Sequence, residues 1–243
     1  MSKRTLALLL HGSGSSGQFM RSACQTADLG VDDVVVLDDR EGDVESLVDA
    51  IDSVIHSVTE SADCVTLIAG VSLGAHAAAL WAARNPHAAE LVEGLLLCLP
   101  AWTGAPDSIA AATARAAEDI QSRGSSTVLD TLLAEHPHDW VAQALAQSWP
   151  DYGDESLVLA LRTASLSPGP TDEQLRDIVL PCAVVALADD PLHPLAVAAH
   201  WVTLIRRSHL VVVPRDLYGE GPHVLGRSAY SALQHARRIS ESQ

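Results

Sequence analysis

The stretch Cys64-Val-Thr-Leu-Ile-Ala-Gly70-Val-Ser72-Leu-Gly74-Ala-His-Ala-Ala-Ala79 joins an apolar run to an alanine-rich segment through one serine between two glycines. The run, Val65–Val71, is short and continuous, which is typical of a strand buried on both faces of a parallel sheet. Alanine favours helices, so the residues after Gly74 predict a helix. The chain is therefore expected to turn sharply at Ser72, between a buried strand and a helix.

The same alternation of apolar runs and helical segments extends in both directions from this turn. Further runs that fit buried strands are Leu6–Leu10, Val34–Leu37, Gly94–Leu99, Ala183–Ala188 and Leu210–Val213. Helical spacing occurs over Val44–Val58, Ala75–Asn85, Leu195–Arg206 and Ser228–Ser240. Strands that alternate with helices predict an α/β fold with a doubly wound, mostly parallel sheet.

One long segment interrupts this alternation. From about residue 104 to residue 172 the sequence contains no strand-like run, and its helical stretches are Ile109–Arg123, Thr127–Glu135, Val141–Ser148 and Glu155–Ala164. The segment is too long for an ordinary connection, so we expect a helical cap over the carboxyl edge of the sheet. The predicted domains are a core of residues 1–103 and 173–243 and a cap of residues 104–172.

The composition excludes several classes of partner. The 243 residues include 31 Asp and Glu against 15 Lys and Arg, a formal charge of -16 that is spread along the chain. Such an acidic excess disfavours binding to nucleic acids and to anionic membrane surfaces. The apolar runs are also far shorter than the roughly 20 residues that cross a bilayer.

The expected location is the cytoplasm. The apolar stretch Leu6–Leu10 follows two basic residues, but it runs into His11 without the small-residue cleavage site of a signal peptide. The four cysteines are far apart and form no C-x-x-C pair, so they are interpreted as small core residues rather than disulfides: Cys24, Cys64, Cys98 and Cys182.

Ser72 is the candidate nucleophile. A serine at a sharp strand-to-helix turn takes strained backbone angles, and glycines at positions 70 and 74 remove side chains that would collide with neighbouring backbone. The following helix directs its first amides toward the same point, which favours negative charge there. The alternative is a tight turn with a small polar residue, and the strand-turn-helix context favours the nucleophile.

This pattern resembles the α/β-hydrolase fold family, here with a minimal core. The stretch Leu8-Leu-Leu-His-Gly12-Ser-Gly-Ser-Ser-Gly17 is similar to the family's His-Gly loop, which supplies one amide of the oxyanion hole. The resemblance implies the amides of Ser13 and Leu73 as oxyanion donors, with Gly12 beside the substrate. A phosphate-binding loop is the alternative, but the stretch lacks both a Gly-Lys-Ser/Thr ending and G-x-G-x-x-G spacing.

Two later stretches resemble the other parts of the family's triad. Asp190-Pro-Leu-His-Pro194 looks like the acid loop, although the glycine usual three positions before the acid is Leu187 here, so Asp189 stays an alternative. His223 ends Gly-Glu-Gly-Pro-His and stands where the family carries its histidine. The chain order of serine, acid and histidine fits the fold, and the resemblance implies a Ser72, Asp190 and His223 triad. A helix-capping turn and an isolated surface histidine are the alternatives.

Other residues of catalytic or binding type receive simpler interpretations. His76 is expected to pack within the helix after Ser72, and His193 to shape the acid loop. The span His136-Pro-His-Asp139 lacks a distant third ligand, so no metal and no cofactor is implied. Aromatic residues are only 4% of the chain, and three tryptophans fall in or beside the cap: Trp102, Trp140 and Trp149. This concentration suggests that they line a pocket, and ordinary packing within the cap is an equal alternative.

The predicted function is that of a serine hydrolase. It would cleave a carboxylic ester or thioester of a small to medium apolar acyl group, with His223 taking the proton of Ser72 and Asp190 stabilising the imidazolium. The expected partner is a small-molecule ester or thioester, and the sequence leaves the oligomeric state, acyl length and leaving group open. The alternatives are an acyltransferase or thioesterase acting on a carrier-bound acyl chain, and a non-catalytic ligand-binding protein of the same fold.

Overall fold

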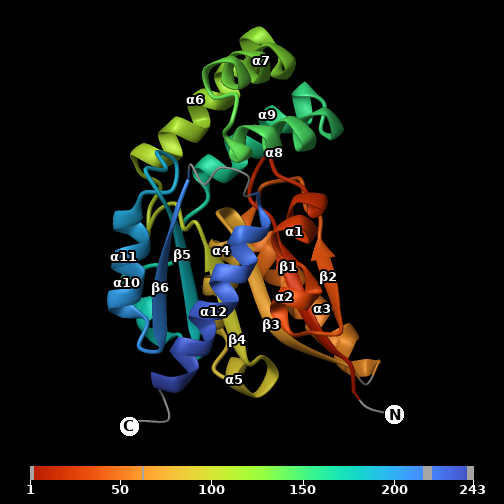
Figure 1. Ribbon diagram of the computed structural model, residues 1–243, viewed down its shortest axis with the longest axis vertical. Coiled ribbons are helices and arrows are strands. Elements are labelled where there is room, and N and C mark those ends of the chain that lie inside the picture. The colour runs from red at the N-terminus through yellow and green to blue at the C-terminus, as the bar shows by residue number, and fades with distance from the viewer. Residues whose placement is uncertain (1–2, 62, 216–220, 240–243) are drawn as a thin grey trace.

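The computed structural model describes residues 3–61, 63–215 and 221–239, and its centre is one six-stranded sheet (Figure 1). The strands are β1 (Thr5–Leu10), β2 (Asp33–Leu37), β3 (Cys64–Val71), β4 (Gly94–Cys98), β5 (Cys182–Ala188) and β6 (Ser208–Pro214). Every neighbouring pair is parallel. The predicted strands are therefore confirmed, with small shifts at their ends.

The strand order is β2-β1-β3-β4-β5-β6, so the winding direction reverses between β1 and β3. Open α/β sheets bind ligands at such a reversal, outside the carboxyl ends of the strands. In this chain β1 leads into His11 and Gly12 there, and β3 leads into Ser72. The doubly wound fold predicted from the sequence is confirmed.

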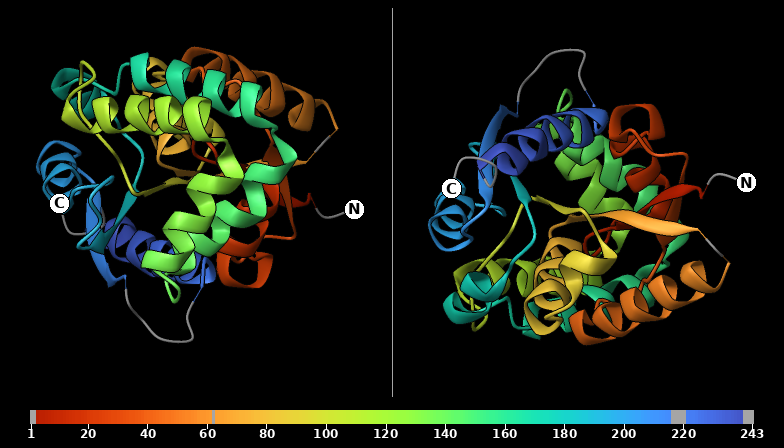
Figure 2. Two further views of the ribbon diagram at one scale, coloured as in Figure 1. Left: turned by 90° about the horizontal axis from the view of Figure 1, so that it is seen from above. Right: turned by 90° about the horizontal axis from the view of Figure 1, so that it is seen from below.

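Helices cover both faces of the sheet (Figure 2, right). They are α1 (Gly17–Ala23), α2 (Thr26–Leu29), α3 (Val44–Glu60), α4 (Leu73–Arg84), α5 (Ala88–Leu91), α6 (Ser108–Arg123), α7 (Ser125–Glu135), α8 (Trp140–Ser148), the 3-10 turn η1 (Trp149–Asp151), α9 (Asp154–Leu166), α10 (Asp172–Asp177), α11 (Leu195–Leu204) and α12 (His223–Ile239). The predicted long helices are present. The last begins at His223 rather than Ser228, because Pro222 precedes it and proline suits a helix start.

The core has two apolar layers, one on each side of the sheet. Leu8 and Leu10 of β1 face the layer that α3, α4, α10 and α11 complete. Ala7 and Leu9, the alternate residues, face the layer of α1, α2 and α12. This burial of successive residues on opposite faces is the reason that the strands read as continuous apolar runs.

The helices α6 to α9 lie between β4 and β5 in the chain and gather at one end of the sheet (Figure 1; Figure 2, left). They have their own apolar cluster, which contains Trp149, Tyr152 and Leu157. The Tyr152 hydroxyl donates to the Ser15 carbonyl at 2.7 Å, which ties this cluster to the loop after β1. Whether residues 104–172 form a separate domain remains a prediction.

All four cysteines are free thiols. Cys24, Cys98 and Cys182 are buried as expected, whereas Cys64, at the start of β3, is partly exposed. Within the described ranges, no helix combines the length and apolar character needed to span a bilayer.

Candidate active site

Ser72 stands at the turn between β3 and α4, with φ 54° and ψ -117°. A β-carbon added at Gly70 would lie 2.2 Å from the Gly74 carbonyl oxygen, and one added at Gly74 would lie 2.4 Å from the Leu10 carbonyl oxygen. Both separations are far below contact distance, so the turn requires glycine on both sides of the serine. The close packing of backbone around Gly70 and Gly74 fixes the position of the Ser72 hydroxyl at the start of α4.

Three residues with strained backbone lie at the same edge of the sheet. In the described part of the chain, positive φ outside glycine occurs at Ser72, Leu99 and Asp189, with values of 54°, 55° and 58°. Each residue directly follows one of three adjacent strands, β3, β4 and β5. Such angles cost about 1–3 kcal/mol each and persist where the surrounding structure holds them, typically at functional sites.

The two predicted oxyanion donors, Ser13 and Leu73, lie at the cavity that contains Ser72. Leu73 is the first residue of α4, so its amide has no acceptor within the helix and lies at the positive end of the helix dipole. Gly12 packs directly on the serine, because a β-carbon there would lie 2.9 Å from Ser72 Cβ and 3.5 Å from Ser72 Oγ. Ser13 follows Gly12, and Ser13 and Leu73 line the same cavity as Ser72. Their role as donors remains a prediction.

A cavity of about 170 Å³ opens over Ser72. Its upper wall comes from the cap helices and is mainly apolar: Ile109, Ala112, Ala116, Trp140, Val141, Ala144, Leu145, Trp149 and Leu161. Trp102 lines the cavity too, so the lining includes all three tryptophans for which the sequence left pocket lining and ordinary packing open. Among the described residues, the lining includes no Asp, Glu, Lys or Arg, so the cavity suits an uncharged group.

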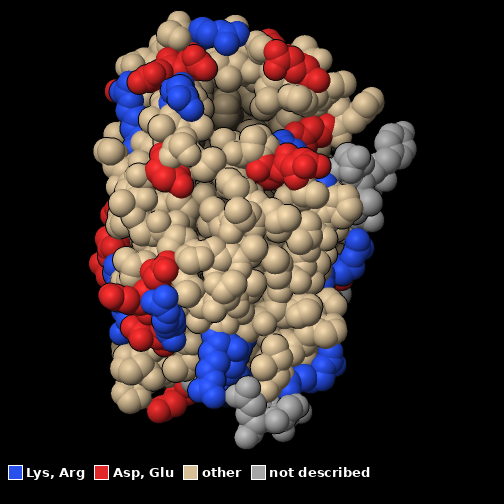
Figure 3. Space-filling model, turned by 90° about the vertical axis from the view of Figure 1, so that its left-hand side faces the viewer, with Lys and Arg blue, Asp and Glu red and all other residues tan. Residues whose placement is uncertain are grey.

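The surface around the cap end is hollowed as well. Figure 3 shows the side of the molecule that lies to the left in Figure 1, where much of the surface is uncharged and a hollow opens near the upper end. Acidic side chains gather near that end of the view.

Asp190 is buried, with 7% of its surface exposed, whereas Asp189 is exposed. The carboxylate of Asp190 accepts hydrogen bonds from His193 Nδ1 at 3.0 Å, the Leu192 amide at 3.0 Å and Arg215 Nη1 at 3.2 Å. Burial on its own would raise the pKa of Asp190, but these bonds and the charges of His193 and Arg215 outweigh it and lower the pKa to about 2. Asp190 is therefore ionised at neutral pH and buried, and its role as the acid of a triad remains a prediction.

The two histidines near the acid are placed differently. His193 lies beside Asp190 and lines the cavity that also contains Ser72. His223 is the first residue of α12 and is partly buried, and it is not among the described residues that line this cavity. Residues 219 and 220 of the predicted histidine loop lie outside the described residues. The structure thus brings Asp190 to His193, and the role of His223 stays a prediction.

Arg215 is a residue that the sequence analysis missed. It follows β6, and besides Asp190 it contacts Asp139, with Nη2 2.5 Å from the Asp139 Oδ2 atom. Asp139 in turn caps α8 by accepting from the Val141 amide. Arg215 therefore links the buried acid to the cap, a contact that no local motif signals.

His76, one helical turn after Ser72, has a structural role. Its Nε2 atom accepts from the amides of Ala101 and Trp102 at 3.1 and 3.4 Å, and its ring meets the Trp102 ring edge-on. Burial, with a smaller contribution from the charge of His193, lowers the pKa of His76 to about 3. The neutral ring holds the chain after Leu99 in place, as the sequence predicted for a packed histidine.

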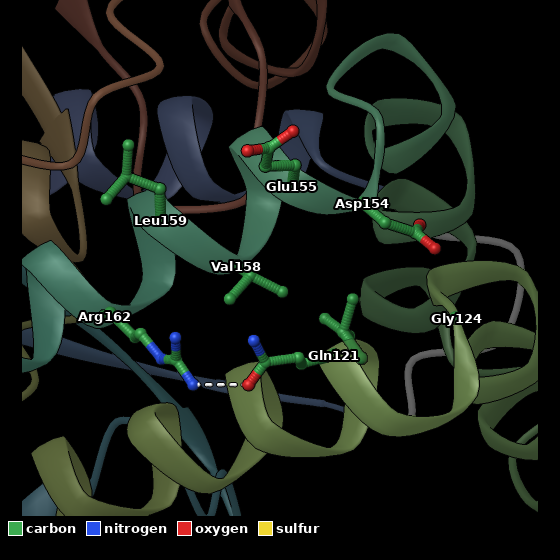
Figure 4. A pocket seen from close by; sticks show the side chains of 8 residues that line it. Gln121, Gly124, Asp154, Glu155, Val158, Leu159 and Arg162 are labelled. Carbon is green, nitrogen blue, oxygen red and sulfur yellow. Dashed lines mark hydrogen bonds between the residues drawn. The ribbon is translucent and has the colours of Figure 1, made fainter.

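A second hollow of about 550 Å³ lies between α6 and α9 (Figure 4). It is larger than the Ser72 cavity, but its described lining contains no Ser, Cys or His, and Arg162 in it is bound to Gln121 at 2.7 Å. It therefore lacks the serine or cysteine and the histidine that a serine-hydrolase type of site requires. No group of three or more His, Cys, Asp or Glu suited to a metal ion is found in the described ranges.

Comparisons with known proteins identify the fold. No protein-family model and no curated protein matches the chain. Among solved structures, a carboxylesterase structure from Nitrososphaera gargenis is similar with a TM-score of 0.73 and 15% identity, over 98% of this chain and 92% of that one. A thermophilic esterase from Thermogutta terrifontis has a TM-score of 0.70 and 17% identity, over 100% and 91%.

A third similar structure is the enol-lactonase from Burkholderia xenovorans LB400, with a TM-score of 0.69 and 13% identity over 99% of this chain and 90% of that one. At these identities the likeness concerns the fold. The chain has the α/β-hydrolase fold, and the resemblance predicted from the sequence is confirmed at that level.

Proposed function

We propose that this chain is a serine hydrolase that cleaves carboxylic esters of small to medium, uncharged acyl groups, with Ser72 as the nucleophile. The observation that carries the proposal is the strained serine at the β3–α4 turn, packed against Gly12 beneath an apolar cavity. Strain at this position would be costly in a turn without a function.

The reaction proceeds in two halves through an acyl-enzyme. Ser72 Oγ attacks the ester carbonyl while a histidine held by Asp190 takes its proton, and the amides of Ser13 and Leu73 stabilise the oxyanion. A donor of this kind contributes about 3–4 kcal/mol to the transition state. The histidine then gives the proton to the departing alcohol, and a water molecule repeats the sequence to release the acid.

The acyl group is proposed to be uncharged because the described lining of the cavity has no ionic side chain. Similar solved structures are those of a carboxylesterase, an esterase and an enol-lactonase, which supports ester chemistry on this fold. A thioester would follow the same steps with a thiol as leaving group. Four free cysteines support a cytoplasmic location.

The test compares Ser72→Ala with Ser53→Ala, an exposed serine on α3. We expect Ser72→Ala to lower the turnover of p-nitrophenyl esters, acetate to laurate, by up to about a million-fold. A fluorophosphonate should label Ser72 in the wild type and in Ser53→Ala, as mass spectrometry of peptides would show. Retained turnover in Ser72→Ala, or a label on another residue, would contradict the proposal.

A further inference from the structure

We infer that Tyr152, a residue that directly follows the cap turn η1, positions the loop that carries the predicted oxyanion donor Ser13. The inference rests on the proposed function and adds a positioning residue to the same site. It also gives the cap a second role, because the end of α8 and η1 would then support the reaction as well as cover the substrate.

The loop after β1 makes a tight turn around Ser13. The Ser15 amide donates to the Gly12 carbonyl at 3.1 Å, which closes the turn, and Gly14 has φ 69°. A positive φ at the third residue is typical of a type II turn, and the closing hydrogen bond does not use the amide of the second residue, Ser13. The turn therefore sets the direction of this amide, so a contact that fixes Ser15 also fixes the donor.

Tyr152 binds the residue that closes this turn. Its hydroxyl donates to the Ser15 carbonyl at 2.7 Å, so Ser15 is held by Gly12 through its amide and by the cap through its carbonyl. The side chain of Tyr152 is buried, and this burial raises the pKa of the hydroxyl. The hydroxyl is therefore a neutral donor at all pH values at which an esterase would be assayed.

Two neighbours of Tyr152 in the chain contact the same loop. The hydroxyls of Ser148 and Ser16 share a buried hydrogen bond of 3.0 Å. Trp149 packs on Gly14, because a β-carbon added to this glycine would lie 3.2 Å from the indole Nε1 atom. Three successive residues of the loop, 14 to 16, are thus each in contact with the segment 148–152.

Arg40 holds the turn η1 from the loop after β2. Its guanidinium lies 5.1 Å from the centre of the Tyr152 ring, and it donates to the Asp151 carbonyl at 2.9 Å and to Asp38 at 3.2 Å. Asp38 in turn accepts from the Gly17 amide at 2.9 Å, at the start of α1. The Tyr152 hydroxyl therefore comes from a segment that is itself fixed to the core.

Tyr152 lies close to both predicted oxyanion donors but does not border the substrate cavity. It lines a narrow gap together with Gly12, Ser13 and Leu73, and it is not among the described residues that line the Ser72 cavity. Its hydroxyl can thus affect the reaction only through the loop. A displacement of about 1 Å in a reacting group can lower a rate about a hundred-fold, so a looser turn should slow the chemical step and leave acyl binding unchanged.

The experiment compares Tyr152→Phe with Tyr230→Phe in the full-length chain. Tyr230 is a partly buried residue of α12, and its hydroxyl would lie 2.8 Å from a β-carbon added at Gly30, which precedes β2. Tyr152→Phe should lower kcat for p-nitrophenyl butyrate about ten- to a hundred-fold, with KM within about twofold of the wild type. Its chain-length profile from acetate to laurate should keep its shape, and Tyr230→Phe should match the wild type.

A trifluoromethyl ketone provides a readout that a purely structural role would not change, because it forms an oxyanion adduct with a reactive serine. Its inhibition constant should rise in Tyr152→Phe by about the factor by which kcat/KM falls. Ser148→Ala removes the contact with Ser16 and should change both quantities in the same direction. Circular dichroism checks that Tyr152→Phe is folded, and Ser148→Ala carries the same test if it is not.

A wild-type kcat in Tyr152→Phe, an equal loss in Tyr230→Phe, or a rise in KM with an altered chain-length profile would overturn the inference. An unchanged inhibition constant beside a lowered kcat would also overturn it, because the loss would then not concern the oxyanion. Failure of the proposed function would be recognised separately, because Ser72→Ala would then keep its activity whatever the tyrosine variants do.

Discussion

The floor and the roof of the Ser72 cavity are built in different ways. The floor consists of the carboxyl ends of adjacent strands, with positive φ at Ser72, Leu99 and Asp189 and with backbone packed so closely that two glycines are required. The roof consists of cap helices with regular backbone and small or apolar side chains, such as Ala112, Ala116 and Ala144. One wall is strained and polar, and the other is relaxed and apolar.

Under the proposed function, the floor would carry the reacting groups and the roof would select the substrate. Strained backbone keeps its shape only where a sheet holds it, so reacting groups on the floor have fixed positions. A helix, in contrast, tolerates a change of one side chain without a change of backbone, so the roof can alter the size of the cavity alone. Substitutions in the floor should therefore affect rate and stability, and substitutions in the roof should affect substrate preference.

After Ser72→Ala, the largest effect is expected from the buried acid of the floor. Asp190→Asn should lower kcat by about ten-thousand-fold, because an amide can donate to the histidine and favour the wrong tautomer. Asp189→Asn, next to it but exposed, should stay close to the wild type. Ester turnover of the two variants measures this directly, and the opposite ranking would assign the acid to Asp189.

The second expected effect concerns the stability of the turn. Gly74→Ala places a β-carbon 2.4 Å from the Leu10 carbonyl oxygen, so it should lower the free energy of unfolding by about 3 kcal/mol or more. Gly153→Ala in the cap meets no atom within 4 Å and should cost only about 1 kcal/mol for its positive φ. Urea unfolding of both variants tests the comparison. Equal decreases in the free energy of unfolding would show that the backbone of the floor is not more closely packed than that of the cap.

The third effect is the response to acid. The pKa of Asp190 is about 2 in the folded protein, below the usual value of about 3.9, so its contribution is present above pH 4 and is lost as pH falls toward 2. The loss should be about 2 kcal/mol. Urea unfolding between pH 2 and 5 should show a shallower pH dependence in Asp190→Asn than in the wild type or Asp189→Asn. Parallel curves for all three proteins would contradict the lowered pKa.

The smallest effect is expected in the roof. Ala116→Leu should narrow the cavity and shift preference toward shorter acyl groups by about 1–3 kcal/mol per methylene, with the optimal ester almost unaffected in kcat. Ala111→Leu on the same helix is exposed and outside the lining, so it serves as the matched control. Chain-length profiles for p-nitrophenyl esters would reveal the shift, and identical profiles would exclude α6 from the acyl pocket.

Adjacent residues were enough to predict most of the core. Buried strands appear as apolar runs, long helices as periodic segments, and the turn at Ser72 as a serine between two glycines, because each depends on burial period or on local sterics. The three tryptophans line the cavity, but their positions in the chain left ordinary packing as an equal alternative. Short helices such as α1 and α10 escaped prediction, since they contain too few residues to show a period.

Contacts among distant residues could not be predicted in this way. Asp139, Asp190 and Arg215 meet although they come from the cap, the loop after β5 and the end of β6. Which donor binds the Asp190 carboxylate depends on how three separate segments pack. The spacing of residues in the sequence does not predict this choice of donor. His193 was recognisable as a residue of the acid loop, but its contact with the carboxylate at the edge of the Ser72 cavity arises from that packing, since hydrogen-bond partners are selected by distance in the folded chain.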